Sequence, residues 1–262
     1  MAASGAEHVD PAPGVPCWVN LMVGDLSAAR AFYAAVLGWE FRASALGGEF
    51  LVASSGGAPV AGIGARRPGL APDSVWTPYF AVRDADVTAA RIQERGATLA
   101  VGPVALGEGR AGLAADRDGA AFGFWEGPAL AWSVGQGSAP ARLDLQTRDV
   151  FDAAVFYGEV FGWAVEPGID IVHRDDHVLV EHGGRVALSL RGGGVQTSEH
   201  RHLRPRWLVN FAVDDVERAV AAAVAHGAGR PESSAASWAP KGYSRTLQDP
   251  DGGLFTLTRR EP

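Results

Sequence analysis

The residues with the most chemical potential lie close together between positions 173 and 182. His173, His177, Glu181 and His182 offer the imidazole and carboxylate groups that bind zinc or serve as general bases. The alternation of a β-strand, however, puts His177 and Glu181 on one face and His182 on the other. Arg174 lies within this segment and Arg185 follows it. We therefore favour a polar β-hairpin over a displaced metal site.

Other reactive groups have simpler interpretations. His200 and His202 lie in a loop rich in Gly, Ser, Thr and Arg, which indicates a solvated connector or the rim of a cavity. Two Asp-x-Asp-Gly segments, 116–119 and 249–252, offer paired carboxylates, but this pattern is typical of a turn. Cys17 is the only cysteine, which excludes an intramolecular disulfide and multi-cysteine metal sites. No histidine partner for a catalytic thiol is evident beside it.

An internal repeat supplies the elements that must position these groups. Segment 25–39 recurs as 149–163, with Asp, Phe-Tyr, Val and Gly-Trp at a constant offset of 124 positions. Segments 79–119 and 210–252 share Phe-Ala-Val, a helical run and Asp-x-Asp-Gly at an offset of 131 to 133 positions. The chain is therefore two homologous halves. We predict a disordered lead at 1–14, domains at 15–130 and 141–260, and a linker at 131–140.

Each half divides again into two modules of the order β-α-β-β-β. Segment 18–23 alternates at period two and leads into Asp25, a residue type that starts helices, while Gly38 suits the helix end. The last quarter contains apolar residues at the spacing of an amphipathic helix: Val216, Ala219, Val220, Ala223 and Val224. Gly227 is the expected C-terminal cap of that helix. Short β-rich stretches broken by Gly and Pro follow each helix. The predicted fold class is α+β, with four such modules.

Composition limits the partners. Of 262 residues, 47% are hydrophobic, and the net charge is −7, which argues against a general electrostatic grip on nucleic acids or anionic membranes. There is no run of about 18 apolar residues, so we predict no membrane span. We expect a cytoplasmic protein with a small-molecule partner. Whether two copies associate as a homodimer stays open at this point.

The strand–Val-x-Asp–helix pattern with Phe-Tyr and Gly-Trp, closed by Asp-x-Asp-Gly before a last strand, resembles the vicinal oxygen chelate superfamily. That group includes glyoxalase I, extradiol dioxygenases, and fosfomycin and bleomycin resistance proteins. The resemblance covers nearly all of residues 15–260, in both halves. It implies two glyoxalase-like domains whose mixed β-sheets curl into cups. It implies no single function, because this fold hosts lyases, isomerases, oxygenases and plain binding proteins.

The resemblance also implies where a metal would be held. In metal-dependent members, His, Gln or Glu ligands occupy fixed strand positions relative to the helix-starting Asp and to the Asp-x-Asp-Gly turn. The matching positions here carry Trp18, Thr77, Gly123, Arg142, Leu208 and Thr256. None of these supplies imidazole or carboxylate, and Arg142 would repel a cation. We therefore predict no metal and no cofactor.

With those positions facing inward, strand alternation predicts the lining of each cup. The first half contributes Trp18, Asn20, Met22, Thr77, Tyr79, Gly123 and Trp125; the second contributes Arg142, Asp144, Gln146, Leu208, Asn210, Thr256 and Thr258. The first set is aromatic and suits a flat, drug-sized organic ligand. In the second, Arg142 suits a carboxylate or enolate oxygen, unless it and Asp144 only neutralise each other.

Two functions from different classes follow. The first is metal-independent binding of a hydrophobic or aromatic small molecule of the natural-product or antibiotic type, as in bleomycin resistance proteins. The alternative is a metal-independent isomerase, cyclase or lyase of secondary metabolism, in which Asp144 acts as general acid or base and Arg142 stabilises developing negative charge. A third, weaker hypothesis is an unusual metal enzyme that uses His173, His177 and His182.

Overall fold

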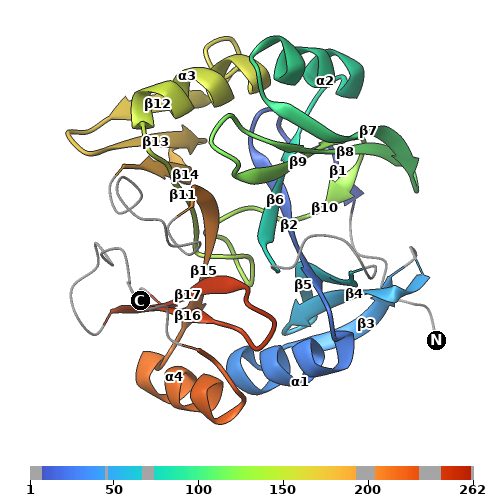
Figure 1. Ribbon diagram of the computed structural model, residues 1–262, viewed down its shortest axis with the longest axis vertical. Helices are drawn as coiled ribbons and strands as arrows, with labels where there is room; N and C mark the ends of the chain where they lie inside the picture. The colour runs from blue at the N-terminus through green and yellow to red at the C-terminus, as the bar shows by residue number, and fades with distance from the viewer. Residues whose placement is uncertain (1–7, 45–46, 67–73, 193–203, 230–242, 261–262) are drawn as a thin grey trace.

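The computed structural model describes residues 8–44, 47–66, 74–192, 204–229 and 243–260. In this part of the chain, the helices lie on the outside of the two large β-sheets, with α1 beside α4 and α2 beside α3 (Figure 1). The first half contains β1 (His8–Val9), β2 (Pro16–Val23), α1 (Leu26–Leu37), β3 (Glu40–Ser44), β4 (Gly47–Ser55), β5 (Ala58–Ala65), β6 (Trp76–Ala81), α2 (Ala85–Glu94), β7 (Thr98–Leu106), β8 (Gly109–Ala115), β9 (Ala121–Glu126) and β10 (Ala129–Leu130). The second contains β11 (Arg142–Gln146), α3 (Val150–Phe161), β12 (Ile169–His173), β13 (His177–His182), β14 (Arg185–Arg191), β15 (Arg206–Val213), α4 (Val216–Ala225), β16 (Ser244–Gln248) and β17 (Leu254–Arg259).

Each half builds one mixed sheet from its two modules. The first sheet has the strand order β3-β4-β5-β2-β6-β9-β8-β7, and the second has the order β12-β13-β14-β11-β15-β17-β16. In both, the first strands of the two modules pair antiparallel at the centre, and each has a parallel neighbour on its other side. Within the described residues, the fourth module has two strands after its helix. The predicted α+β class and the two-domain, four-module architecture are confirmed.

The helix ends follow from the residues that cap them. The Asp25 carboxylate accepts hydrogen bonds of 2.9 Å from the backbone N–H groups of Ser27 and Ala28, and Gly38 ends α1 in the left-handed region at φ 67°. The equivalent helix α3 is capped by Asp149 and ends at Gly162, with φ 72°. Helix α4 differs from the sequence prediction, because its cap is His226 and the glycine follows one residue later.

The two halves are joined by a reciprocal exchange of buried polar contacts. The Tyr33 hydroxyl on α1 donates a 2.7 Å hydrogen bond to Asp249 in the fourth module, and Tyr157 on α3 donates a 3.0 Å bond to Asp116 in the second. Each phenol oxygen also accepts an indole N–H at 3.3 Å, from Trp76 or Trp207 in a central strand. Each half therefore covers part of its partner's sheet with its own first helix.

Apolar contacts follow the same exchange. Phe32 of α1 packs edge-on against Phe255 of β17, with ring centroids 5.9 Å apart, and Phe161 of α3 stacks on Phe80 of β6 at 4.3 Å. These rings belong to the buried core. The repeated Phe-Tyr pairs, Phe32-Tyr33 and Phe156-Tyr157, lie in this core.

The N-terminal lead departs from the prediction. Residues 8–14 were expected to be disordered, yet β1 pairs with β10 and the Trp163 indole donates a 2.7 Å hydrogen bond to the Gly14 carbonyl. The predicted linker is also packed, because Trp132 is 8% exposed and its indole donates a 2.8 Å bond to the Val60 carbonyl. Both segments are therefore fixed by contacts that composition does not reveal.

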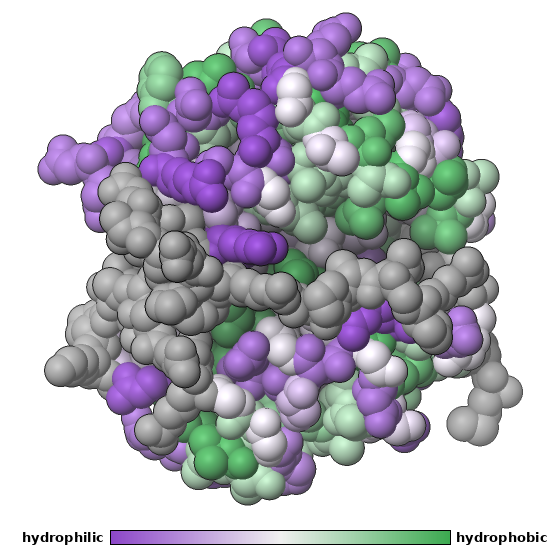
Figure 2. Space-filling model, in the orientation of Figure 1, coloured by the Kyte–Doolittle hydropathy of each residue, from purple (hydrophilic) through white to green (hydrophobic). Residues whose placement is uncertain are grey.

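Among the described helices, none has the length and apolarity needed to cross a bilayer. The face in Figure 2 mixes hydrophilic and hydrophobic residues, and hydrophobic side chains gather over β7 and β8, where Val101 and Val104 are 44% and 48% exposed.

Candidate functional site

The residues predicted to line the first cup share one face of the first sheet, which we call the first-half cup face. Trp18 pairs with Tyr79 across β2 and β6, Asn20 pairs with Thr77, and Tyr79 pairs with Gly123 across β6 and β9. Directly paired residues in neighbouring strands point to the same side of a sheet. Met22 is 39% exposed at the end of the same row of side chains. The structure therefore brings all seven predicted residues to this face: Trp18, Asn20, Met22, Thr77, Tyr79, Gly123 and Trp125.

Aromatic rings lie across glycines on this face. A Cβ atom on Gly123 would lie 2.3, 2.4 and 2.7 Å from three consecutive ring carbons of Tyr79, so the phenol ring occupies the space above that glycine. The indole of Trp125 covers Gly109 in the same way, with a closest approach of 2.4 Å. Phe50, which the sequence analysis missed, covers Gly64 at 2.5 Å. The glycines let flat rings lie close against the sheet.

The side-chain amide of Asn20 hydrogen-bonds to the polar groups of two aromatic residues on this face. The Trp18 indole donates a 2.8 Å hydrogen bond to Asn20 Oδ1. Burial raises the pKa of Tyr79, and a side-chain hydrogen bond with Asn20 opposes that rise. The tyrosine hydroxyl is therefore a neutral group at physiological pH. Asn20 holds two aromatic side chains in place, which is the preorganisation that a binding surface needs.

The second-half cup face carries a hydrogen-bonded carboxylate at its centre. Asp144 is 5% exposed, and its Oδ2 accepts from Arg142 Nε at 3.0 Å and from Asn210 Nδ2 at 2.9 Å. Its Oδ1 accepts a short hydrogen bond from the Ser189 hydroxyl. Both carboxylate oxygens are thus occupied, and Asp144 fixes the positions of the groups around it.

The remaining predicted residues of this face surround that centre. Thr256 and Thr246 share a 3.0 Å hydrogen bond, Leu208 is buried, and Gln146 is half-buried at the end of β11. Two arginines that the sequence analysis missed also lie on this face, because Arg191 and Arg206 both pair with Gln146. Their signal was available only through the strand register, since nothing in the local sequence distinguishes them from surface arginines.

The donor set at the family's metal positions does not fit a divalent cation. In the first half these positions hold Trp18, Thr77 and Gly123, and in the second Arg142, Leu208 and Thr256. An indole, an alkyl group or a guanidinium supplies no lone pair suited to such an ion. Across the described parts of the chain, no group of three or more His, Cys, Asp or Glu side chains is arranged to hold a metal.

The histidine cluster forms a polar hairpin, as the alternation predicted. His177 lies 2.5 Å from the Asp176 carboxylate, while His173 is exposed on β12. Glu181 and His182 end β13 at the tight connection to β14. His200 and His202 lie outside the described residues.

The other candidate groups have structural roles. Asp116 accepts backbone hydrogen bonds of 3.0 and 2.8 Å from Asp118 and Ala120, which confirms a turn. Burial raises the pKa of Asp116 and of its counterpart Asp249. Burial also raises the pKa of the Cys17 thiol to about 12, so it is not a nucleophile at neutral pH.

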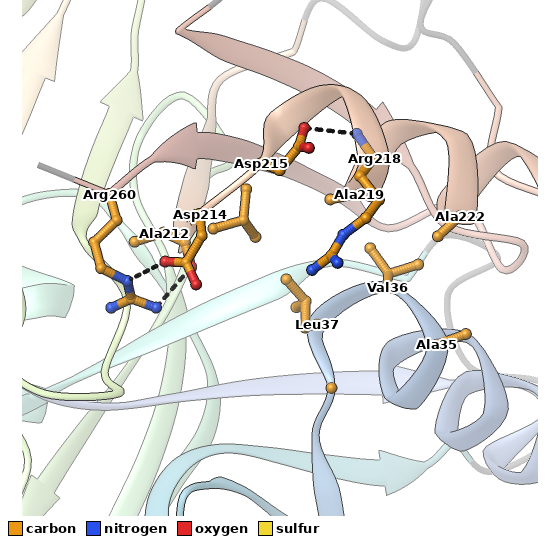
Figure 3. A pocket seen from close by; sticks show the side chains of 12 residues that line it. Ala35, Val36, Leu37, Ala212, Asp214, Asp215, Arg218, Ala219, Ala222 and Arg260 are labelled. Atoms are coloured by element: carbon orange, nitrogen blue, oxygen red, sulfur yellow. Dashed lines mark hydrogen bonds and ion pairs between the residues drawn. The ribbon is translucent and has the colours of Figure 1, made fainter.

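A groove of about 470 Å³ between α1 and α4 is a separate feature on the outside of the molecule (Figure 3). Its acidic groups already have partners: Asp214 accepts from Arg260 Nε at 2.9 Å, and Asp215 accepts from the Arg218 backbone as the cap of α4. Val36 and Leu37 of α1 and alanines of α4 contribute to the groove's lining. It carries none of the predicted site residues.

Comparisons with known proteins agree with this architecture. Residues 17–124 match the Glyoxalase/Bleomycin resistance protein/Dioxygenase superfamily, and residues 142–258 match a glyoxalase-like domain. The chain is 31% identical to the anthracycline biosynthesis protein DauV of Streptomyces sp. (strain C5), covering 94% of this chain and 93% of the relative. It is 28% identical to the putative glyoxylase CFP32 of Mycobacterium bovis, covering 95% and 96%.

Solved structures show the same fold at low sequence identity. A Mn(II)-bound glyoxalase from Novosphingobium aromaticivorans superimposes with a TM-score of 0.56 at 17% identity, covering 95% of this chain and 82% of that one. The 2,3-dioxygenase LapB from Pseudomonas sp. KL28 gives 0.58 at 13% identity, covering 97% and 94%. The chain belongs to the glyoxalase/bleomycin resistance protein/dioxygenase superfamily, as a tandem member with non-ligating residues at the metal positions.

Proposed function

We propose that this protein binds a planar aromatic small molecule on the first-half cup face without a metal ion. The observation that carries the proposal is the set of rings laid over glycines, with Tyr79 above Gly123 and Trp125 above Gly109. Rings held close to the sheet offer broad apolar surfaces at little conformational cost, which suits stacking against a flat ligand. Asn20 adds one fixed polar contact point beside them.

The names of relatives support the same ligand class. Two relatives at 31% identity are named anthracycline biosynthesis proteins, from Streptomyces sp. (strain C5) and Streptomyces peucetius. Anthracyclines are planar polycyclic compounds, and such a ring system matches the breadth of an aromatic face. We take a natural product of this shape as the ligand class.

The hydrogen bonds of Asp144 favour a binding function over a catalytic one. A general base needs an oxygen free to take a proton from the substrate. Both oxygens of Asp144 already accept hydrogen bonds, from Arg142 and Asn210 on one side and from Ser189 on the other. The isomerase, cyclase or lyase alternative would have to break this network first.

Calorimetric titration with an anthracycline aglycone tests the proposal. Trp18→Ala should weaken binding by about two- to tenfold, because an aromatic contact contributes ~0.5–1.5 kcal/mol and ~1.4 kcal/mol is a factor of ten. Phe151→Ala is the control, since Phe151 is 70% exposed on α3, away from the cup face. Equal affinity of wild type and Trp18→Ala would refute the placement of the site.

Two further measurements separate the functions. Affinity should be unchanged after dialysis against a chelator, and loss of binding there would refute metal independence. Chromatography of the aglycone after long incubation should show no conversion. A product whose formation is abolished in Asp144→Asn but retained in Glu181→Gln would instead establish the enzyme alternative.

A further inference from the structure

Three polar residues form one row across the second sheet. Gln146 ends β11 and pairs with Arg191 of β14 on one side and with Arg206 of β15 on the other. Paired residues in adjacent strands project from the same face. Two guanidinium groups therefore flank one amide, on the face that also carries Asp144.

Among the described residues, the arginines at this row outnumber the carboxylates that act on them. Asp144 contacts Arg142 at 3.0 Å and Arg191 at 3.7 Å. The exposed carboxylate of Asp176 also acts on Arg191 electrostatically. Neither acid reaches Arg206, which has no ion pair in the described part of the chain.

The Arg206 side chain has a hydrogen-bond donor that is unsatisfied within the described residues. Its Nε atom is buried and has no hydrogen-bond partner in the described structure. Burial alone lowers the pKa of Arg206 to about 10, so the group remains charged at neutral pH. A buried N–H without an acceptor is unfavourable, and an anionic ligand would supply that acceptor to the half-buried Arg206 side chain.

The internal repeat shows that the fold does not require these residues. Met22 stands 124 positions before Gln146, and it pairs with Gly64 as Gln146 pairs with Arg191. Val75 stands 131 positions before Arg206. The first half builds the same sheet with Gly64, Met22 and Val75, so the polar row is specific to the second half.

We propose that Arg206, Gln146 and Arg191 form a binding site for an oxyanion carried by an organic molecule, a carboxylate or a phosphate. The guanidinium fork donates two parallel N–H groups to such an anion, and the Gln146 amide adds a third donor beside it. Asp144 and Ser189 hold Arg191 in place, since Arg191 Nε donates to Ser189 Oγ at 3.1 Å. This site goes beyond the proposed function, because it lies in the other half and requires no aromatic ligand on the first-half cup face.

Thermal unfolding with benzoate, phenyl phosphate and neutral benzyl alcohol as probes, at constant ionic strength, tests the site. Benzoate or phenyl phosphate should raise the melting temperature, and benzyl alcohol should not; the stronger of the two anions identifies the headgroup. The rise should disappear in Arg206→Met and in Gln146→Met. It should persist in Arg185→Met, an exposed arginine of the same sheet, and in Trp18→Ala of the first half. No rise with either anion, or a rise that persists in Arg206→Met, overturns the proposal.

A second measurement separates a binding role from a structural one. In chloride buffer without the probes, Arg206→Met should melt no lower than Arg185→Met, because the substitution removes a buried Nε–H that has no partner among the described residues. A markedly lower melting temperature for Arg206→Met would assign the residue to the fold and refute the anion site. Loss of aglycone binding in Trp18→Ala tests the first-half proposal independently, so the two can fail separately.

Discussion

The buried tyrosine–aspartate pairs that join the halves allow a sharp stability prediction. Tyr33→Phe removes one oxygen atom and keeps the ring. The lost hydroxyl donates to Asp249 Oδ2 at 2.7 Å and accepts the Trp76 indole N–H at 3.3 Å. Asp249 keeps its two backbone hydrogen bonds on Oδ1, of 3.0 and 2.7 Å, so the turn itself should persist.

The expected decrease in the free energy of unfolding of Tyr33→Phe has two contributions. A hydrogen bond to a charged group contributes ~1.5–3 kcal/mol, and a buried N–H left without an acceptor costs ~1–3 kcal/mol. The indole contact is long, so we take the lower part of that range and expect a total of ~2–4 kcal/mol. At ~2–4 °C per kcal/mol for a chain of this size, the melting temperature should fall by ~5–15 °C.

Guanidinium unfolding followed by circular dichroism measures this loss. Tyr157→Phe should lose a similar amount, and Tyr243→Phe, 52% exposed, is the control. Stability of Tyr33→Phe within ~0.5 kcal/mol of the wild type, the range for neutral surface substitutions, would refute the reasoning.

The same pair predicts a pH dependence. Burial raises the pKa of folded Asp249 above its unfolded value, whereas the Tyr33 hydrogen bond lowers it. The contribution of Asp249 to stability is therefore fully present below the unfolded pKa and is lost as the pH rises through the folded pKa. Because Tyr33 stabilises the ionised form, the deficit of Tyr33→Phe should be largest above the folded pKa and shrink in acid.

Three further predictions concern other parts of the molecule. Gly123→Ala should lower the free energy of unfolding by ~1–3 kcal/mol and weaken aglycone binding, because the new Cβ would lie 2.3 Å from the Tyr79 ring. Gly102→Ala is the control, because a Cβ there would have nothing within 4 Å, and equal effects of the two substitutions in calorimetry would contradict the prediction. Cys17 should react with a thiol-specific disulfide reagent only after unfolding, because burial raises its pKa to about 12; rapid reaction of the folded protein would contradict this. The first half alone, residues 15–130, should self-associate in size-exclusion chromatography, because the apolar surface that packs against Phe255 would be exposed; a well-folded monomer would show that the exchange of helices is dispensable.

Sequence reasoning was strongest where local spacing decides structure. The recurrence of Phe-Tyr and Gly-Trp identified both first helices and their ends, because period and caps are local properties. It could not show that Tyr33 bonds Asp249 of the other half, since a hydrophobic stripe specifies a buried face but not its partner. The sequence did not predict Arg191 and Arg206 on the second-half cup face, for a related reason. Insertions change the repeat offset along the chain, so only the strand register shows that both lie beside Gln146.

The two faces of each sheet are subject to different constraints, and this explains how one repeat can carry two sites. Strand alternation separates the helix-covered face from the cup face. The covered face keeps Tyr33 and Tyr157, with their tryptophan and aspartate partners, because either loss leaves a buried group unpaired. The two cup faces carry different residues at equivalent positions of the repeat; Trp18 of the first half, for example, is equivalent to Arg142 of the second. Variants in one cup should therefore leave the other half's binding intact, and function must be tested in each half separately.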